Sequence, residues 1–163
     1  PSAPPPRACH RYSLRHRMLY FLQNLVYYIS YEVLEPRWHK MMQQLTHPDI
    51  KTVDDVRKHH IDFLNACLKE CLLVYGPLYK KLYELISDCS TFADRVQGQK
   101  VTARGGGDDA YTLFIQRSSV AFDSHLLRFM DALRDNAHAE YHVQLKNLIA
   151  RLDYNGFYSR RLP

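Results

Sequence analysis

Apolar residues recur at intervals of three and four along most of the chain, and the first long run covers residues 14–33. This spacing places side chains on one face of an α-helix. Further apolar and aromatic residues widen the face until most of the helix girth is apolar, which is typical of a helix inside a bundle. The primary face is Leu14, Met18, Leu22, Leu25, Ile29 and Val33, and the widening residues are Tyr20, Phe21, Tyr27, Tyr28 and Leu34.

The run continues into the segment "YYISYEVLEPRW", residues 27–38. Pro36 lacks an amide donor, and its ring clashes with the carbonyl four residues earlier. The first helix is therefore predicted to bend at Pro36, or to end and restart there. We expect Trp38, the only tryptophan, to lie in the core and to anchor the segment that follows. Pro36 and Trp38 are both assigned structural roles, and the helical pattern resumes at Met41, Met42 and Leu45.

A second helix is predicted from the capping pattern at Thr52, with Asp55 three residues later. Gly76-Pro77 supplies a stop and then a proline suited to the first turn of a third helix. The second stripe is Val56, Phe63, Leu64, Cys67, Leu68, Cys71 and Val74, and the third is Leu78, Leu82, Leu85, Cys89, Phe92 and Val96.

Glycines concentrate in residues 98–109, where the periodicity stops, so we predict a flexible loop there. Asp108 or Asp109 can cap a fourth helix, and a fifth is expected from about Glu140. The fourth stripe is Phe114, Ala121, Phe122, Leu126, Phe129, Met130 and Leu133, and the fifth is Tyr141, Leu145, Leu148 and Leu152. Since no segment alternates as a strand does, the prediction is an all-α bundle of about five helices.

Composition fits one folded domain. Of the 163 residues, 46% are hydrophobic and 24% are charged, whereas disordered chains carry far less apolar side chain. The proline-rich residues 1–12 are interpreted as a tail or linker, with folding from about Ser13, so that residues 13–163 form the domain. Residues 18–34 are the only candidate membrane span, but they include Gln23, Asn24 and Glu32. No membrane association is expected.

The net charge of +5 and the pI near 9.1 favour an acidic partner. One alternative function is a basic helical module that binds nucleic acid. Because the basic residues are scattered, without a dense arm or an aromatic-interleaved run, we do not expect nucleic-acid binding. With four cysteines in a chain of this length, a reducing compartment fits better than a disulfide framework.

For each group of residues that resembles a catalytic or metal site, a structural role is the simpler interpretation. Cys67 and Cys71, with His60, can be drawn as a metal site, but they continue an apolar stripe and are interpreted as core residues. His138 and His142 lack the glutamate of a zinc-protease helix and are interpreted as surface residues. The pair formed by His59 and His60 lacks an orienting carboxylate beyond Asp62. We therefore expect no enzyme activity, no metal and no cofactor.

The 12 tyrosines can serve a core or an interface, since tyrosine combines apolar area with a hydroxyl that tolerates water. We expect about half to be packed and half to be available to a partner.

Three stretches resemble the gamma-tubulin complex components, most closely the component 2 type. They are "LRHRMLYFLQNLVYYISYEVLEPRWHKM", "VDDVRKHHIDFLNACLKECLL" and "RLDYNGFY". The resemblance covers most of residues 13–97 and about 120–158. Its specific features are Gln-Asn before Tyr-Tyr, Glu-Pro-x-Trp, His-x-x-Phe-Leu and Asn-Gly-Phe-Tyr, in that order.

The resemblance implies a non-enzymatic scaffold. In this family the C-terminal helical domain holds gamma-tubulin, and an N-terminal domain, absent here, associates with neighbouring components. Together they form the small and ring complexes that template microtubules at a microtubule organising centre, the centrosome or spindle pole body, in the cytoplasm. The resemblance also implies that the chain starts inside the C-terminal domain and that its glycine-rich segment stands where relatives carry a variable insertion.

For contacts with gamma-tubulin we single out exposed polar groups near the distinctive motifs. An Asn-Gly pair is equally typical of a turn, so that alternative stays open for Asn155. The predicted contacts are Arg15, Arg17, Asn24, Asn155 and Tyr158.

Overall fold

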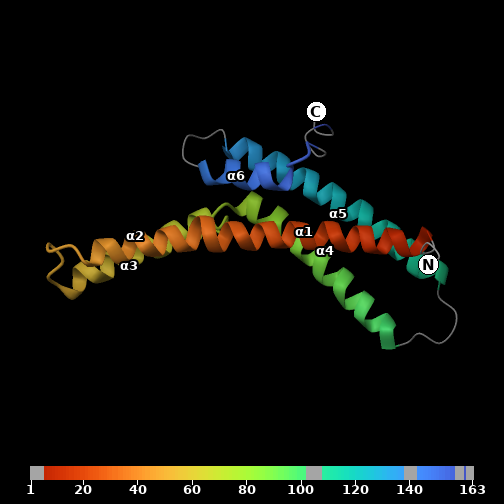
Figure 1. Ribbon diagram of the computed structural model, residues 1–163, viewed down its shortest axis with the longest axis horizontal. Helices are drawn as coiled ribbons and strands as arrows, with labels where there is room; N and C mark the ends of the chain where they lie inside the picture. Colours follow the sequence, from red (N-terminus) through yellow and green to blue (C-terminus); the bar gives the residue numbers. More distant parts are fainter. Residues whose placement is uncertain (1–5, 102–107, 138–142, 157–159, 161–163) are drawn as a thin grey trace.

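The computed structural model describes residues 6–101, 108–137, 143–156 and 160, with side chains over 10–98, 110–136, 145–156 and 160. Every regular element in these ranges is helical, which confirms the all-α prediction. The elements are α1 (Pro6–Tyr27), the π-helix η1 (Tyr28–Leu34), α2 (Glu35–Leu45), α3 (Val53–Glu70), α4 (Gly76–Val101), α5 (Asp108–Ala137) and α6 (Val143–Leu152). Since α1, η1 and α2 join into one rod, the described residues form the five predicted helices (Figure 1).

The long rod changes helix type immediately before Pro36. Over Tyr28–Leu34 it is π-helical, and the Glu35 amide donates to the carbonyl of Ser30, five residues back. A π turn shifts the carbonyls relative to the next turn, which relieves the clash that Pro36 would cause in an α-helix. Pro36 then lies in the first turn of α2, where a missing amide donor costs little. The predicted interruption of the first helix at Pro36 is confirmed, as a π-helical segment directly before the proline.

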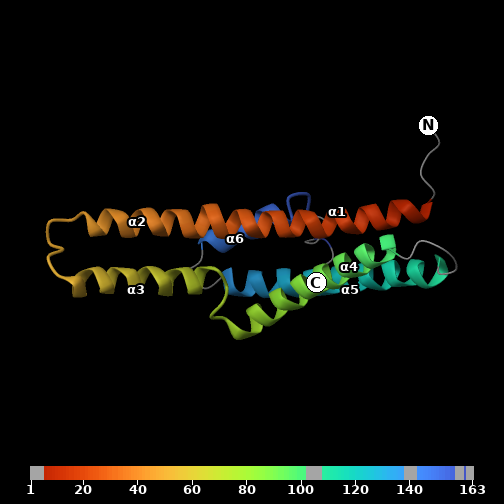
Figure 2. The ribbon, with the colours of Figure 1, turned by 90° about the horizontal axis from the view of Figure 1, so that it is seen from below.

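The core lies where α1, α4 and α6 pack around α5 (Figures 1 and 2). The ring of Phe21 from α1 packs edge-on against Phe122 and Phe129 of α5, with ring centroids 6.1 Å apart in each case. From the third predicted stripe, Leu78, Leu82, Leu85, Cys89 and Phe92 are buried, as are Leu145, Leu148 and Leu152 of α6. Periodicity therefore predicted the central core correctly.

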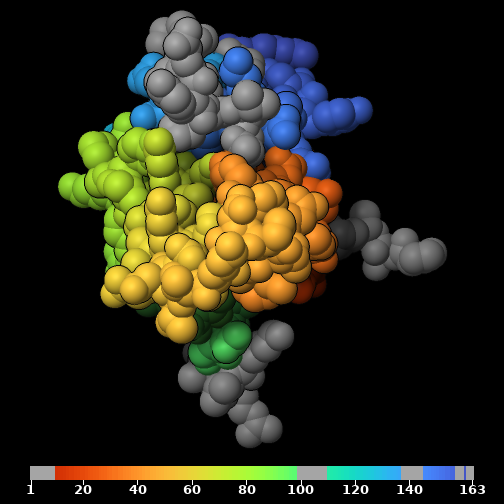
Figure 3. Space-filling model, turned by 90° about the vertical axis from the view of Figure 1, so that its left-hand side faces the viewer, coloured from red at the N-terminus to blue at the C-terminus, as the bar shows by residue number. Residues whose placement is uncertain are grey.

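The hairpin of α2 and α3 projects beyond this core as an arm (Figures 1 and 2). The end-on view in Figure 3 shows its tip, in orange and yellow, nearest the viewer. The capping box at its turn is confirmed: the Thr52 hydroxyl accepts from the Asp55 amide, and the Asp55 carboxylate accepts from the Thr52 amide. The Thr52 hydroxyl also donates to the Asp55 carboxylate at 2.8 Å, and this bond, with those from the Thr52 and Lys51 amides, holds the pKa of Asp55 below its ordinary value.

The predicted burial of the α3 stripe is wrong over most of its length. Cys67 and Cys71 are buried at the base of the arm, but Val56, Leu64 and Leu68 are more than 40% exposed. The spacing correctly predicted which residues lie on one side of α3, but not whether another helix covers them. In the described part of the chain α2 packs against the side of α3 that carries Phe63, and no other helix covers the flank that carries Val56, Leu64 and Leu68.

Trp38 also departs from the prediction. Its side chain is 50% exposed on the arm, so its expected place in the core is wrong. The indole ring packs edge-on against Phe63 of α3, with ring centroids 5.9 Å apart. The tryptophan thus lies at the edge of the α2–α3 interface.

Three predicted boundaries shift. The helix α1 begins at Pro6, ahead of the expected start at Ser13, since proline suits a first helical turn. Residues 98–101 belong to α4, because a single exposed glycine costs a helix only about 1 kcal/mol. Helix α3 ends at Glu70, before Gly76, through a Schellman motif whose left-handed residue is the buried Leu72, with φ of 67°. Residues 102–107, Glu140 and Tyr141 lie outside the described ranges.

Among the described residues, none of the helices combines the length and the apolar character that a bilayer span requires.

The cysteines with described side chains are free and buried, which confirms their interpretation as core residues. Burial raises the pKa of the Cys71 thiol to about 11 and that of Cys89 to about 12, and it also raises the pKa of Cys67. Because the thiolate is the reactive form, these residues are poorly suited to nucleophilic or redox chemistry.

Two truncations distinguish the core from the arm. We expect Phe122→Ala to lower the free energy of unfolding by about 3–5 kcal/mol, since Phe122 is fully buried. Trp38→Ala should lower it by only about 1 kcal/mol, because half of the side chain already contacts water. Urea denaturation followed by circular dichroism measures both, and a larger loss for Trp38→Ala would contradict the arm geometry.

Thiol labelling tests the buried cysteines. In a Cys9→Ser variant, which removes the cysteine without a described side chain, the other three should react with a disulfide reagent at pH 8 at least about tenfold more slowly when folded than in urea. The raised pKa values leave little thiolate at that pH. Rapid labelling of the folded protein would contradict the structure.

Candidate binding surfaces

The predicted contact residues do not gather at one place. Arg15 is exposed on α1, whereas Asn155 follows α6 near the end of the described chain. Tyr158 lies outside the described residues. No single surface is therefore defined by the five predictions.

Arg17 holds two helices together. Its guanidinium forms an ion pair with Asp123 of α5 and donates a hydrogen bond of 2.6 Å to the Ser119 hydroxyl. About a quarter of each charged side chain remains exposed, so water screens the pair only in part. This structural role was missed at the sequence level, because the partner lies more than 100 residues away in the chain.

Asn24 makes a local hydrogen bond, and Asn155 lies in a local turn. The side-chain amide of Asn24 donates to the Tyr20 carbonyl one turn earlier, at 2.8 Å. The Gly156 amide donates to the Asp153 carbonyl at 2.9 Å, and Gly156 has a positive φ of 65°. Asn155 therefore lies in a turn that needs glycine at the next position, as the alternative interpretation proposed.

Two of the distinctive motifs meet in space. We call the meeting place the motif junction: Tyr20, Tyr27, Tyr31 and Glu32 from the long rod, and Arg151 from α6. The Arg151 guanidinium donates to Glu32 at 2.9 Å and lies 4.1 Å from the centroid of the Tyr27 ring. The Tyr20 hydroxyl donates to the Arg151 carbonyl at 2.5 Å. The segment that ends in Asn-Gly is thus fastened to the tyrosine-rich part of the rod.

A buried carboxylate completes this attachment. The Asp153 side chain is only 3% exposed and pairs with Arg134 of α5 at 3.3 Å. A buried carboxylate without a partner would be costly, so Arg134 stabilises the place where α6 ends. The motif junction thus binds α6 to the long rod, and the Arg134–Asp153 pair binds its end to α5. Tyr27 and Tyr31 keep 41% and 59% of their surface exposed.

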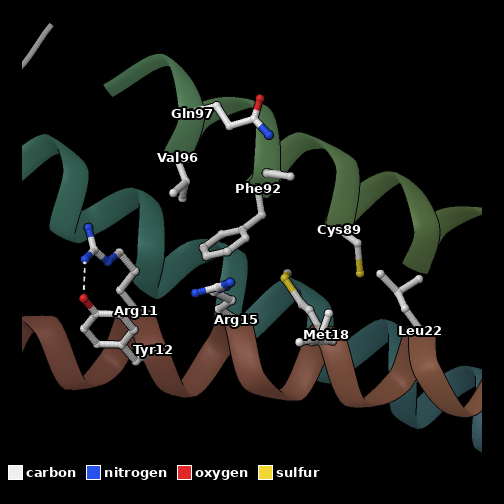
Figure 4. A pocket seen from close by; sticks show the side chains of 11 residues that line it. Arg11, Tyr12, Arg15, Met18, Leu22, Cys89, Phe92, Val96 and Gln97 are labelled. Atoms are coloured by element: carbon white, nitrogen blue, oxygen red, sulfur yellow. Dashed lines mark hydrogen bonds between the residues drawn. The ribbon is translucent and has the colours of Figure 1, made fainter. Parts of the chain in front are cut away.

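An open groove of about 400 Å³ lies between α1 and α4 (Figure 4). Its floor and walls are mostly apolar, and Arg11 and Arg15 lie toward one end. The lining residues from α1 are Arg11, Tyr12, Arg15, Met18, Leu19 and Leu22, and those from α4 are Cys89, Phe92, Ala93, Val96 and Gln97. Arg15 is thus the predicted contact that lines a concave surface.

Neutral groups surround the other arginine in the groove. The Arg11 guanidinium donates to the Tyr12 hydroxyl at 3.1 Å. Hydrogen bonds to Tyr111 and Tyr12 raise the pKa of Arg11 above its ordinary value, so this side chain keeps its charge.

The candidate metal residues do not form a ligand set. Within the described part of the chain, no group of three His, Cys, Asp or Glu side chains is placed to hold a metal ion. His60 stacks on Phe63 of its own helix, with ring centroids 6.4 Å apart. His138 and His142 lie outside the described residues. His125 and Asp88, which were not singled out, form a 2.7 Å contact that joins α5 to α4.

The tyrosines divide less evenly between core and surface than predicted. Of those with described side chains, Tyr28 is buried, and Tyr75 and Tyr111 are partly buried. The others are exposed: Tyr12, Tyr20, Tyr27, Tyr31, Tyr79, Tyr83 and Tyr154. More of this aromatic surface is available to a partner than we expected.

Comparison with known proteins places these features in a family. The family model described as "Gamma tubulin complex component C-terminal" matches residues 3–158. Over 195 aligned residues the chain is 28% identical to gamma-tubulin complex component 2 of Mus musculus, with 93% of this chain and 21% of that protein covered.

Two further relatives match a shorter part at higher identity. The chain is 45% identical over 80 residues to spindle pole body component alp4 of Schizosaccharomyces pombe, covering 49% of this chain and 10% of that protein. It is 41% identical over 80 residues to gamma-tubulin complex component 2 of Arabidopsis thaliana, covering 49% and 12%. The chain thus spans about a fifth or less of the length of these relatives.

Proposed function

The chain belongs to the gamma-tubulin complex component family, since the model of the C-terminal domain matches residues 3–158, and from this premise we propose that it binds gamma-tubulin without catalysing a reaction. The observation that carries the proposal is the extent of that match, which takes in almost all of the described helices. The relatives named above include two that are gamma-tubulin complex component 2, so a role in the same complex follows from the family.

The surface supports a binding role. Exposed tyrosines and arginines lie along α1, and the arm exposes Trp38, Leu64 and Leu68. Aromatic side chains and arginines supply much of the energy of protein interfaces. The net charge of +5 favours encounter with an acidic protein and raises the association rate more than the affinity.

The mechanism we propose is positional. A gamma-tubulin molecule held on this domain would be set beside others held on neighbouring components of the complex. Gathering subunits in advance removes entropy that they would otherwise lose during nucleation. We place this activity at a microtubule organising centre, in keeping with the spindle pole body named for the relative from Schizosaccharomyces pombe.

Among the predicted contacts, Arg15 and Asn155 have exposed side chains and stay in the proposal as contact residues. Arg17 and Asn24 are partly buried and already hydrogen-bonded within the chain. Their contribution to a gamma-tubulin interface would act through the shape of α1. Tyr158 stays a prediction from the sequence.

A capture experiment tests the proposal. The immobilised chain should retain purified gamma-tubulin and much less alpha/beta-tubulin at the same concentration. Arg15→Glu should weaken gamma-tubulin capture by about tenfold, because the exposed cation would become an anion facing an acidic partner.

Arg128→Glu is the matched control, since Arg128 is an exposed arginine on α5 away from the predicted contacts, and its capture should equal that of the wild type. Equal retention of the two tubulins, or no retention of either by the folded chain, would overturn the proposal.

A further inference from the structure

Helix α1 carries two apolar stripes, and the second contributes to the core only through Leu22. The first includes Leu14, Phe21 and Leu25, which are buried against the rest of the bundle. The second follows intervals of three and four along another side of the helix, the spacing of a helix that packs against a partner helix. Its members are Tyr12, Arg15, Leu19, Leu22 and Val26.

Most of this second stripe is open to solvent. Tyr12 is 52% exposed, Leu19 45% and Val26 61%. At 1.5 Å per residue the stripe is about 21 Å long, which is nearly four helical turns. Contiguous apolar surface of this kind is uncommon on a protein unless something binds there.

The second stripe of α1 borders the groove between α1 and α4. In Figure 4 the side chains of Phe92 and Val96 on α4 point toward those of Arg15 and Met18 on α1. The apolar lining of the groove thus comes from both helices.

The charged side chains that line the groove are both basic. Elsewhere in the described structure Arg17, Arg37 and Arg151 each pair with a carboxylate. Neither Arg11 nor Arg15 forms an ion pair with any described residue, and no acidic side chain lines the groove. The groove therefore combines an apolar floor with two cations that have no ion-pair partner among the described residues, which complements a partner that is both apolar and acidic.

We propose that the α1–α4 groove binds an acidic amphipathic helix of a partner protein. The three-and-four spacing of the stripe matches the ridges of a helix, and its length of about 21 Å is that of a helix of about 14 residues. A second copy of this chain is disfavoured as the occupant, because two molecules with a net charge of +5 repel each other. The inference does not depend on gamma-tubulin being the protein that supplies the helix.

A peptide-binding experiment tests this inference independently of gamma-tubulin capture. The probe is a fluorescein-labelled peptide of about 18 residues with leucines on one helical face and glutamates on the other, a length of about 27 Å when helical. Its counterpart carries lysines in place of the glutamates. By fluorescence anisotropy the glutamate peptide should bind the chain at least about tenfold more tightly than the lysine peptide.

Variants locate the binding. Leu19→Glu and Arg15→Glu should each weaken binding of the glutamate peptide by about fivefold or more, through the loss of apolar contact and of charge complementarity respectively. Leu64→Glu on α3 and Arg128→Glu on α5 are the matched controls and should leave the affinity unchanged, since Leu64 and Leu19 are similarly exposed, at 43% and 45%. Circular dichroism checks the fold, and Ala93→Glu on the facing wall replaces Leu19→Glu if that variant loses helicity.

Three results would overturn the inference. The first is equal affinity for the two peptides, and the second is weakening by the control variants as large as that by the groove variants. The third is saturable binding of oleate, but not of the glutamate peptide, that depends on Leu19 and Arg15, which would assign the groove to an anionic amphiphile.

Discussion

The packing of Phe21 of α1 against Phe122 and Phe129 of α5 is the contact on which the rest of the structure depends. These rings are almost wholly buried, and burial of aromatic area is the largest favourable contribution that single side chains make to folding. They set which face of α1 turns inward. The long rod that continues from α1 through η1 into α2 is thereby fixed in direction, and its remaining faces form the molecular surface.

The surfaces available for binding are the faces of the long rod that the core does not use. One side of the long rod packs against α5 and another against α6, where Arg151 bonds Glu32 and lies over Tyr27. The side toward α4 remains open, as do the outer faces of the arm, so the molecule presents apolar and basic surface without an assembled chemical site in its described part. That combination suits a protein that holds another protein in position. It agrees with membership of the gamma-tubulin complex component family.

The sequence predicted the helices and the central core well, because apolar spacing reports which residues share a helix face. It predicted the arm poorly, since spacing cannot report whether another element covers that face: Leu64 and Trp38 follow the pattern and are still exposed. The capping box at Thr52 was predictable because its partners are three residues apart. The pairing of Arg17 with Asp123, and of Arg134 with Asp153, was not, because those contacts depend on how distant helices pack.

We propose that the outer surface of this helical bundle binds gamma-tubulin while the packing of the core stays unchanged. Hydroxyl-radical footprinting of the chain, with and without purified gamma-tubulin, tests it most directly. We expect gamma-tubulin, but not alpha/beta-tubulin, to protect a contiguous set of exposed side chains, with Phe122 and Phe129 equally unreactive in both states. Protection that is absent, or the same with alpha/beta-tubulin, would contradict the account, as would new reactivity of the core rings.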